Sequence, residues 1–314
     1  MTILDSVIQG VVQGLTEFLP VSSSGHLTIT QHILGVSGTG EENLFFNVML
    51  HIGTLIAVVA FYHKLIGRLI VEFFRMIGDI FTGRFKWKTM NEERRMIIML
   101  IIGLLPLMLL FLPVPGTGQN LKDYVELFTG QKYFIVVGVC LLLTSVLLFI
   151  GSRCSRAVQP LRYAKSGEEG GRSYITVPDA ILIGIAQCFA VLPGLSRSGS
   201  TLAVGQMRGV NKQKALDYTF ILGTPAIIAA AALELKDALK AEGGLNIEIA
   251  PILIGMAVAA VVGYLSIVLF KWLLKTDKMI IFILYTAVVG IAVIAISIIE
   301  MNTGVNFFTK TPIV

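Results

Sequence analysis

Two short polar segments carry the side chains of this sequence that could do chemistry. The first segment, within residues 10–26, contains Gln13, Glu17, Ser22, Ser23, Ser24, Gly25 and His26; the second, within residues 184–201, contains Ser196, Arg197, Ser198 and Thr201. A carboxylate or an imidazole can accept a proton from a hydroxyl or from water, and an activated hydroxyl can act as a nucleophile. A guanidinium suits a bidentate anion such as phosphate. The residue types therefore predict chemistry on an anionic group.

The second segment is a copy of the first at a fixed offset of 174 residues, without a gap. Identical pairs include Asp5 and Asp179, Gly10 and Gly184, Gln13 and Gln187, Ser22 and Ser196, Ser24 and Ser198, and Gly25 and Gly199. The copies differ at two reactive positions, because Glu17 corresponds to Val191 and Ser23 corresponds to Arg197. One copy therefore supplies a carboxylate and an extra hydroxyl, and the other supplies a cation.

The serines of both segments stand just before short apolar stretches. A serine there is an ordinary N-cap of a helix, and one hydroxyl of each group is expected to do only that. The remaining hydroxyls and the free N–H groups of a helix N-terminus form an anion site. Arg197 then either binds a phosphate or pairs with Glu17, and both arrangements can hold in turn. The other histidines (His32, His51 and His63) are interpreted as packing or interface residues.

Composition places both segments in a membrane protein. The chain has 314 residues, of which 55% are hydrophobic and only 14% charged, and its mean hydropathy is +0.80. A soluble protein of this length would need more charge to cover its surface. The net charge of +5 is explained by loops that face anionic lipid, so no nucleic-acid partner is predicted. The three cysteines show no metal-ligand spacing.

Six stretches are long enough to cross a bilayer, which takes about 20 apolar residues. They are 44–63, 95–112, 132–151, 215–235, 249–271 and 279–300. The stretches 5–18 and 179–192 are too short, and each ends near a proline that is followed by serine and glycine. Each short stretch therefore predicts a re-entrant hairpin, in which one helix enters the membrane and a second leads out.

The basic residues predict the orientation. Nineteen of the 25 Lys and Arg residues lie in the segments 64–95, 153–172, 208–214 and 271–278. If the chain crosses the membrane six times, all four segments lie on the same side of it. That side is expected to be cytoplasmic. The prediction is an all-α, single membrane domain of residues 1–314, with inverted-repeat halves 1–151 and 178–300 joined by a cytoplasmic loop, 152–177. Paired broken helices in such repeats mark a binding site near the midplane. Residues 63–81 are interpreted as an interfacial amphipathic helix, with a seventh span as the alternative.

The segments GLTEFLPVSSSGH and PGLSRSGST resemble the undecaprenyl-diphosphatase family, the integral-membrane phosphatases associated with bacitracin resistance. The family motifs are Glu or Gln, three residues, then Glu, and Pro-Gly-x-Ser-Arg-Ser-x-x-Thr. Here they fall on Gln13 to Glu17 and on Pro193 to Thr201. The resemblance implies that Glu17, Ser23, His26 and Arg197 are catalytic. It also implies that Ser22, Ser24, Ser196 and Thr201 contact the substrate phosphates. Gln13, Gly25 and Ser198, which belong to the same polar segments, are expected to bind substrate as well.

The resemblance further implies hydrolysis of undecaprenyl diphosphate to the monophosphate in the bacterial plasma membrane, which recycles a lipid carrier for cell-wall polymers. Ser23 is the candidate nucleophile, with Glu17 or His26 as its base; direct attack by water is the alternative. A divalent cation, Mg²⁺ or Ca²⁺, is implied with the substrate diphosphate, but no dedicated protein metal site is evident, because Gln13 leaves one carboxylate in the motif.

The first hairpin is expected to open outward, so hydrolysis is expected at the outer leaflet. A transporter or flippase of an anionic polyprenyl lipid is the alternative function, since inverted repeats with broken helices are also transporter architecture. Membrane lipids are the expected surroundings. The assembly considered is a homodimer.

Overall fold

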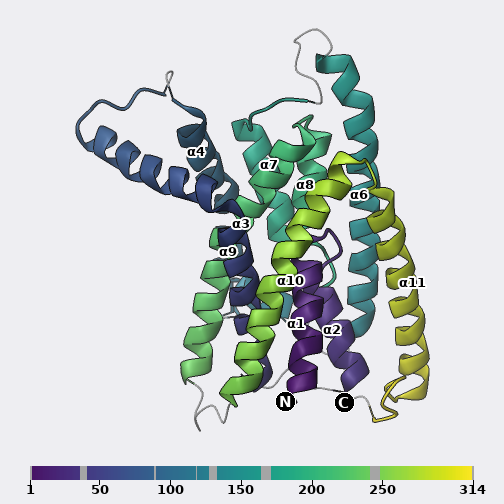
Figure 1. The fold of residues 1–314 in the computed structure, drawn as a ribbon. Helices are drawn as coiled ribbons and strands as arrows, with labels where there is room; N and C mark the ends of the chain where they lie inside the picture. Colours follow the sequence, from purple (N-terminus) through teal and green to yellow (C-terminus); the bar gives the residue numbers. More distant parts are fainter. Residues whose placement is uncertain are drawn as a thin grey trace.

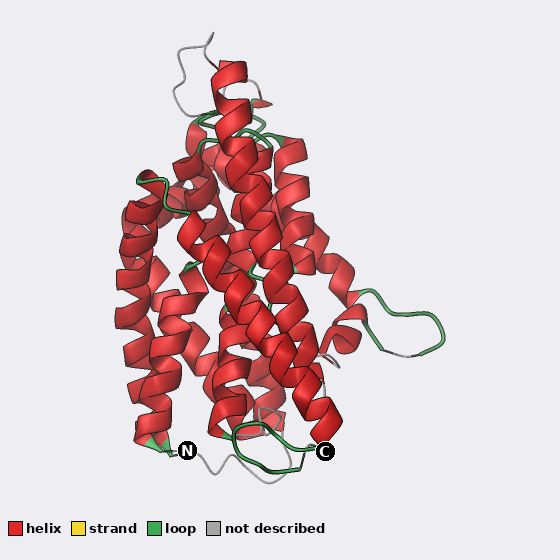
Figure 2. Ribbon diagram, turned by 90° about the vertical axis from the view of Figure 1, so that its right-hand side faces the viewer, coloured by secondary structure: helices red, strands yellow, loops and turns green. Residues whose placement is uncertain are grey.

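The computed structural model describes residues 2–35, 41–87, 90–117, 119–126, 133–163, 171–240 and 248–312. These residues form a bundle of helices joined by loops, with no strand among them (Figures 1 and 2). The helices are α1 (Ile3–Phe18), α2 (Ser23–Leu34), α3 (Glu41–Phe81), α4 (Glu92–Leu104), the 3-10 helix η2 (Leu105–Phe111), α5 (Leu121–Glu126), α6 (Phe134–Tyr163), α7 (Val177–Phe189), α8 (Arg197–Met207), α9 (Lys212–Lys240), α10 (Ile249–Lys275) and α11 (Ile280–Thr303).

Six helical segments of the described chain are long and apolar enough to cross a membrane. They are Phe45–Phe81, Glu92–Phe111, Phe134–Arg156, Lys212–Ala232, Ile249–Lys275 and Ile280–Thr303. A helix satisfies all its backbone hydrogen bonds internally, which is what lipid requires of a spanning segment. The prediction of an all-α polytopic membrane protein with six spans is therefore confirmed.

Two pairs of short helices stand apart from the spans. The first helix of each pair starts with the same capping box, formed by Thr2 with Asp5 in α1 and by Thr176 with Asp179 in α7. At 1.5 Å per residue, α1 and α7 are about 24 and 20 Å long, less than the hydrocarbon core of about 30 Å. Figure 1 shows α1 and α2 in the lower part of the bundle and α7 and α8 in the upper part, so that the pairs enter from opposite ends. This arrangement supports re-entrant hairpins in an inverted repeat, whose placement in a bilayer stays a prediction.

The two halves interlock, because each hairpin packs on a span of the other half. Helix α1 runs along α10, and α7 runs along α4. Glycines permit the close approach: a Cβ atom on Gly14 would lie 2.8 Å from the Cβ of Val262, and the backbone of Gly184 contacts that of Gly103. The halves 1–151 and 178–300 therefore share one packed interior. Their predicted boundaries remain untested, although α6 continues into the predicted loop 152–177, of which residues 164–170 lie outside the described part of the chain.

An aromatic row in the core connects the first hairpin to the spans. Phe18 at the end of α1 meets Phe220 of α9 edge-on at 5.5 Å between ring centroids. Phe220 in turn lies 6.2 Å from Phe270 of α10, and Phe270 lies 5.4 Å from Phe282 of α11. All four rings are buried. Because Phe18 directly precedes the turn of the first hairpin, this row fixes where that turn lies.

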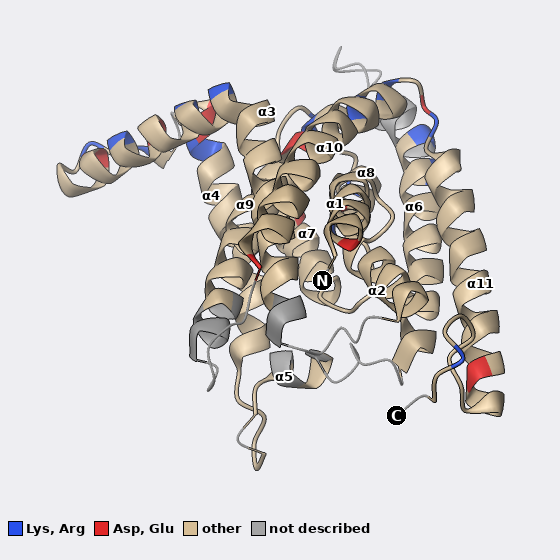
Figure 3. Cartoon of the chain, turned by 60° about the horizontal axis from the view of Figure 1, so that its bottom comes forward, with Lys and Arg blue, Asp and Glu red and all other residues tan. Residues whose placement is uncertain are grey.

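Helix α3 bends at Tyr62, where φ is −98° and ψ is 17°. Beyond Tyr62 the helix turns away from the bundle (Figure 1), and it carries basic side chains such as Lys64 and Arg68. A helix that leaves the bundle axis supports the interpretation of residues 63–81 as an interfacial helix over a seventh span. Figure 3 shows Lys and Arg gathered at this end of the bundle, where α10 is also joined to α11.

Candidate active site

The two hairpins place their helix N-termini against each other in the same way. Ser22 caps α2 and accepts a hydrogen bond from the N–H of Gly25 at 3.2 Å; Ser196 caps α8 and accepts one from the N–H of Gly199 at 3.0 Å. In both helices the capping hydroxyl also lies 3.3 Å from the hydroxyl of the serine two positions further on. The expected N-cap is therefore Ser22 in the first segment and Ser196 in the second. Ser23, Ser24 and Ser198 remain available for other contacts.

The turns touch because glycine stands at their contact. A Cβ atom on Gly25 would lie 2.9 Å from the Cα of Gly194, too close for any other residue without a backbone shift. Gly194 itself has φ of +93°, a left-handed conformation that glycine adopts at little cost. Ser198 completes the contact by donating a hydrogen bond to the carbonyl of Leu19 at 3.2 Å. Gly25 therefore allows the two hairpin turns to pack closely against each other.

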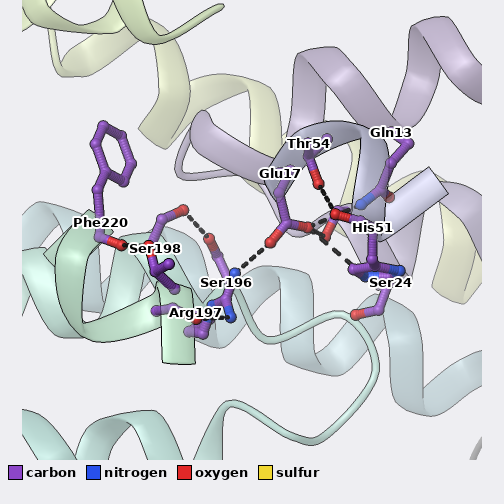
Figure 4. Close-up of polar contacts among 12 residues, drawn as sticks. Gln13, Glu17, Ser24, His51, Thr54, Ser196, Arg197, Ser198 and Phe220 are labelled. Atoms are coloured by element: carbon purple, nitrogen blue, oxygen red, sulfur yellow. Dashed lines mark hydrogen bonds and ion pairs between the residues drawn. The ribbon is translucent and has the colours of Figure 1, made fainter. Parts of the chain in front are cut away.

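Glu17 lies at the centre of the site and is almost completely buried. Its Oε2 accepts hydrogen bonds from Ser23 Oγ at 2.6 Å and from Gln13 Nε2 at 3.0 Å. Its Oε1 pairs with the Nη2 of Arg197, and Nη1 of the same guanidinium donates to the carbonyl of Gly223 at 3.3 Å. Figure 4 shows the carboxylate between its partners. The ion pair between the two copies, one of the two alternatives from the sequence, is the arrangement in this structure.

His51 of α3 is a site residue that the sequence interpretation missed. Its Nε2 lies 3.8 Å from Glu17 Oε2, and its Nδ1 is 2.8 Å from the carbonyl of Asn47. Figure 4 shows the ring reaching Glu17 from the side opposite Arg197. His51 lines the cavity described below, so its interpretation as a packing residue is replaced. The available signal was an imidazole inside a predicted span, since ionisable groups at membrane depth usually face a functional interior.

His26 and Thr201 lie beside the site and line no part of its cavity. His26 Nδ1 is 2.8 Å from the carbonyl of Ser22, and Nε2 is 2.8 Å from the hydroxyl of Tyr285 on α11. A carbonyl only accepts, so Nδ1 carries the proton and Nε2 accepts from Tyr285. Thr201 donates to the carbonyl of Arg197 at 2.8 Å. Both side chains hold the ends of the hairpin helices in place.

A cavity of about 480 Å³ opens at this cluster. At one end it is lined by Glu17, Ser22, Ser23, Ser24, His51, Ser196, Arg197 and Ser198. Its remaining walls come mostly from apolar residues of η2 and α9, among them Leu107, Met108, Phe111, Ala226, Ile227 and Ala230. A cavity that combines polar side chains, a guanidinium among them, with apolar walls fits an amphipathic ligand with an anionic head.

Comparison with known proteins identifies relatives over nearly the whole chain. The family described as bacitracin resistance protein BacA matches residues 6–292. A protein of Bacteroides thetaiotaomicron named undecaprenyl-diphosphatase is 37% identical over 298 residues, which cover 94% of this chain and 98% of the relative. Proteins of the same name from Methanobrevibacter smithii (38% over 297 residues, 93% of this chain and 97% of the relative) and Alkaliphilus metalliredigens (33% over 299 residues, 95% and 100%) are also similar. A match of this extent shows that the chain belongs to the BacA bacitracin resistance family.

Proposed function

We propose that this protein is an integral-membrane phosphatase that hydrolyses undecaprenyl diphosphate to undecaprenyl phosphate and phosphate, and so recycles the lipid carrier for cell-wall synthesis. The observation that carries the proposal is the Ser23–Glu17–Arg197 cluster at the polar end of an apolar cavity. The name of the relatives supports the same substrate. A transporter is not favoured, because a hydroxyl bonded to a buried carboxylate serves proton transfer, which moving a lipid does not require.

The two ends of the cavity would bind different parts of the substrate. The polyprenyl chain would lie against the apolar walls from η2 and α9, where its burial drives binding. The diphosphate would reach the N-termini of α2 and α8, whose N–H groups and dipoles favour an anion. Arg197 would then exchange Glu17 for a phosphate oxygen as its partner. This exchange frees Glu17 Oε1 and leaves Oε2 bonded to Ser23.

The chemistry begins at the hydrogen bond from Ser23 Oγ to Glu17 Oε2, at 2.6 Å. Ser23 Oγ attacks the terminal phosphorus while its proton passes to Glu17, and the bond between that phosphorus and the bridging oxygen breaks. Undecaprenyl phosphate leaves, and water then releases phosphate from the phosphoserine. Arg197 stabilises the charge on the transferred oxygens throughout. Direct attack by water on the substrate, with Glu17 as base, is the competing sequence of steps.

Glu17 suits the role of base better than His26. Both ring nitrogens of His26 are engaged, by Ser22 and by Tyr285, and the ring lines no part of the cavity. We therefore assign His26 a positioning role: its bond to the Ser22 carbonyl supports a residue whose φ of +74° is a strained conformation outside glycine. The strained turn is what places Ser23 at the start of α2, facing Glu17.

A divalent cation, implied by the family, fits these residues only together with substrate. Among the described residues, no group of three His, Cys, Asp or Glu side chains could hold a metal ion. Glu17 is the one carboxylate among the described residues that line the cavity, and its oxygens already contact Arg197, Ser23 and Gln13. Mg²⁺ is often held by one or two carboxylates, phosphate oxygens and water. The ion would therefore be held mainly by phosphate oxygens of the substrate and by water, and it would neutralise charge on the diphosphate.

We further place the protein in the bacterial plasma membrane, with the cavity opening toward the outer leaflet. The support is the concentration of basic residues at the end of the bundle from which α7 and α8 enter (Figure 3). The first hairpin, which carries Glu17 and Ser23, enters from the other end (Figure 1).

The test is phosphate release from undecaprenyl diphosphate by purified protein in detergent. A transporter needs two compartments and would release none. Ser23→Ala should lower turnover by several orders of magnitude, while the matched variant Ser24→Ala should retain most of it, because Ser24 makes no contact with Glu17 among the described hydrogen bonds. Equal and mild losses in both variants would reject Ser23 as nucleophile and favour direct attack by water. An inactive wild-type protein would reject the function itself.

A further inference from the structure

We propose that His51 is a catalytic residue, which accepts a proton from the water molecule that releases phosphate from Ser23. The inference rests on the proposed function and assigns the base of its second step. It starts from an imidazole whose ring nitrogens have different surroundings, beside a carboxylate that has already been used in the first step.

The fold fixes the tautomer and the direction of the His51 ring. Nδ1 donates to the carbonyl of Asn47, one helical turn earlier in α3, at 2.8 Å. Because a carbonyl can only accept, Nδ1 holds the proton and Nε2 presents a lone pair in the neutral ring. Thr54 bonds the backbone of the same residue, donating to the His51 carbonyl at 2.9 Å. Nε2 is thus held toward Glu17, at 3.8 Å from its Oε2.

Exposure to the cavity separates the two bases. The side chain of His51 is 31% exposed, whereas that of Glu17 is 3% exposed. Water in the cavity can therefore reach the imidazole, while Glu17 is covered by Ser23, Gln13 and Arg197. The carboxylate is placed to serve Ser23, and the imidazole is placed to serve a water molecule.

A second base is needed because the first step uses up the only carboxylate of the described cavity. Once Glu17 holds the proton of Ser23, it cannot accept another from water. Gln13, its hydrogen-bonding neighbour, is an amide and cannot act as a base. Glu17, His51 and Arg197 are the ionisable side chains among the described residues that line the cavity, and a guanidinium stays protonated. His51 is thus the base that remains.

The second step then balances. The oxygen of water forms a bond to phosphorus, and the bond from phosphorus to Ser23 Oγ breaks. Glu17 returns its proton to Ser23 Oγ, while His51 Nε2 takes a proton from the attacking water. Phosphate leaves, and the His51 imidazolium releases its proton to the cavity water. Both Glu17 and His51 have then regained their starting states, and the positive charge formed on His51 meanwhile faces the Glu17 carboxylate.

The experiment compares His51→Gln with the matched variant His63→Gln in the full-length protein. His63 lies on the same helix and bonds a backbone carbonyl in the same way, with Nδ1 2.8 Å from the carbonyl of Ala60, but it lines no part of the described cavity. General-base catalysis contributes about 10²- to 10⁴-fold. Turnover in His51→Gln should therefore fall by about 100-fold or more, KM should fall with it because only the second step is slowed, and His63→Gln should match wild type.

A covalent readout separates a base from a structural residue. Acid-quenched samples of His51→Gln incubated with undecaprenyl diphosphate should show phosphoserine at Ser23 by mass spectrometry, at a level well above that of wild type. If His51→Gln folds poorly, His51→Ala should be rescued by added imidazole, since a small neutral base can occupy the space left by the ring. Unchanged turnover in His51→Gln would overturn the assignment. So would loss of turnover without phosphoserine and without rescue by imidazole. An inactive wild-type protein would instead reject the proposed function.

Discussion

Arg197 is the group on which the anion site depends, and its replacement tests that dependence directly. Arg197 connects three parts of the fold. The residue begins α8, and its guanidinium pairs with Glu17 of α1 and donates to the Gly223 carbonyl of α9. Arg197→Ala removes both the cation and this link. Arg197→Lys keeps the charge but offers a point donor, which cannot hold Glu17 and the Gly223 carbonyl together.

The magnitude follows from the burial of Glu17. Removing one partner of a buried ion pair costs about 3–5 kcal/mol, because the other charge remains without compensation. The lower end applies here, since Glu17 keeps hydrogen bonds from Ser23 and Gln13 and the Arg197 side chain is 26% exposed. In a Glu17→Gln background no charge is left behind, so the same change should cost about 1 kcal/mol, the value of an ordinary hydrogen bond. The two sites should therefore couple by about 2 kcal/mol.

The assay is a double-mutant cycle on the free energy of unfolding in mixed micelles, run beside phosphate release. Arg197→Ala should lower turnover by about 10²- to 10³-fold, the usual loss when a group that stabilises developing charge is removed. Arg197→Lys should recover only part of it. Stability losses of Arg197→Ala and Glu17→Gln that add within about 0.5 kcal/mol would show that the sites are independent. Near-wild-type turnover in Arg197→Ala would refute the anion site.

Three further predictions concern packing, pH and orientation. Gly14→Ala should destabilise the protein in a thermal melt, because its Cβ would lie 2.8 Å from the Cβ of Val262, whereas Gly67→Ala, with nothing within 4 Å, should be neutral or better. The hydrogen bond from Lys212 lowers the pKa of Asp277. The stability contributed by the Asp277 carboxylate is therefore present above the ordinary Asp pKa of about 3.9, and it is lost as pH falls through the lowered pKa of Asp277. Asp277→Asn should remove that part of the dependence of stability on acid pH. Single cysteines at Lys86 and Gln119, introduced after the native cysteines are replaced, should be labelled from opposite faces of intact cells, and labelling from one face would contradict the six-span topology.

The spans and the hairpin caps could be predicted from sequence because their causes are local. Hydropathy over about 20 residues identifies a spanning helix, since lipid tolerates little else. The two short helices follow from length and from Pro20 and Pro193. Ser22 and Ser196 could be expected as caps because serine accepts from the first free N–H groups of a helix. The ion pair was one of two alternatives, since duplication put an acid in one copy and a cation in the other.

The contacts that the sequence did not reveal are those made by packing between distant helices. His51 stands in an apolar stretch whose pattern is that of an ordinary span, and only the position of α3 beside α1 brings it to Glu17. Tyr285 reaches His26 from α11, at a sequence separation of 259 residues. The bend at Tyr62 lies next to no proline or glycine, so the sequence does not indicate it. These features depend on how the helices are arranged, which spacing along one helix does not encode.

The two copies differ in charge, and the lining of the cavity gives a physical reason for the difference. In the first copy the Gln13 amide bonds Glu17; in the second, Val191 stands in place of the acid. Gln187 lines the cavity and its amide makes no hydrogen bond among the described residues. A glutamate at position 191 would stand beyond the end of α7 at Phe189, so it would not be held beside Gln187 as Glu17 is held beside Gln13 within α1. Because Val191 lines the cavity, the new carboxylate would also face the diphosphate, and one guanidinium would then oppose two acids. Because like charges in a low-dielectric cavity repel strongly, the apolar Val191 keeps a second acid away from the diphosphate.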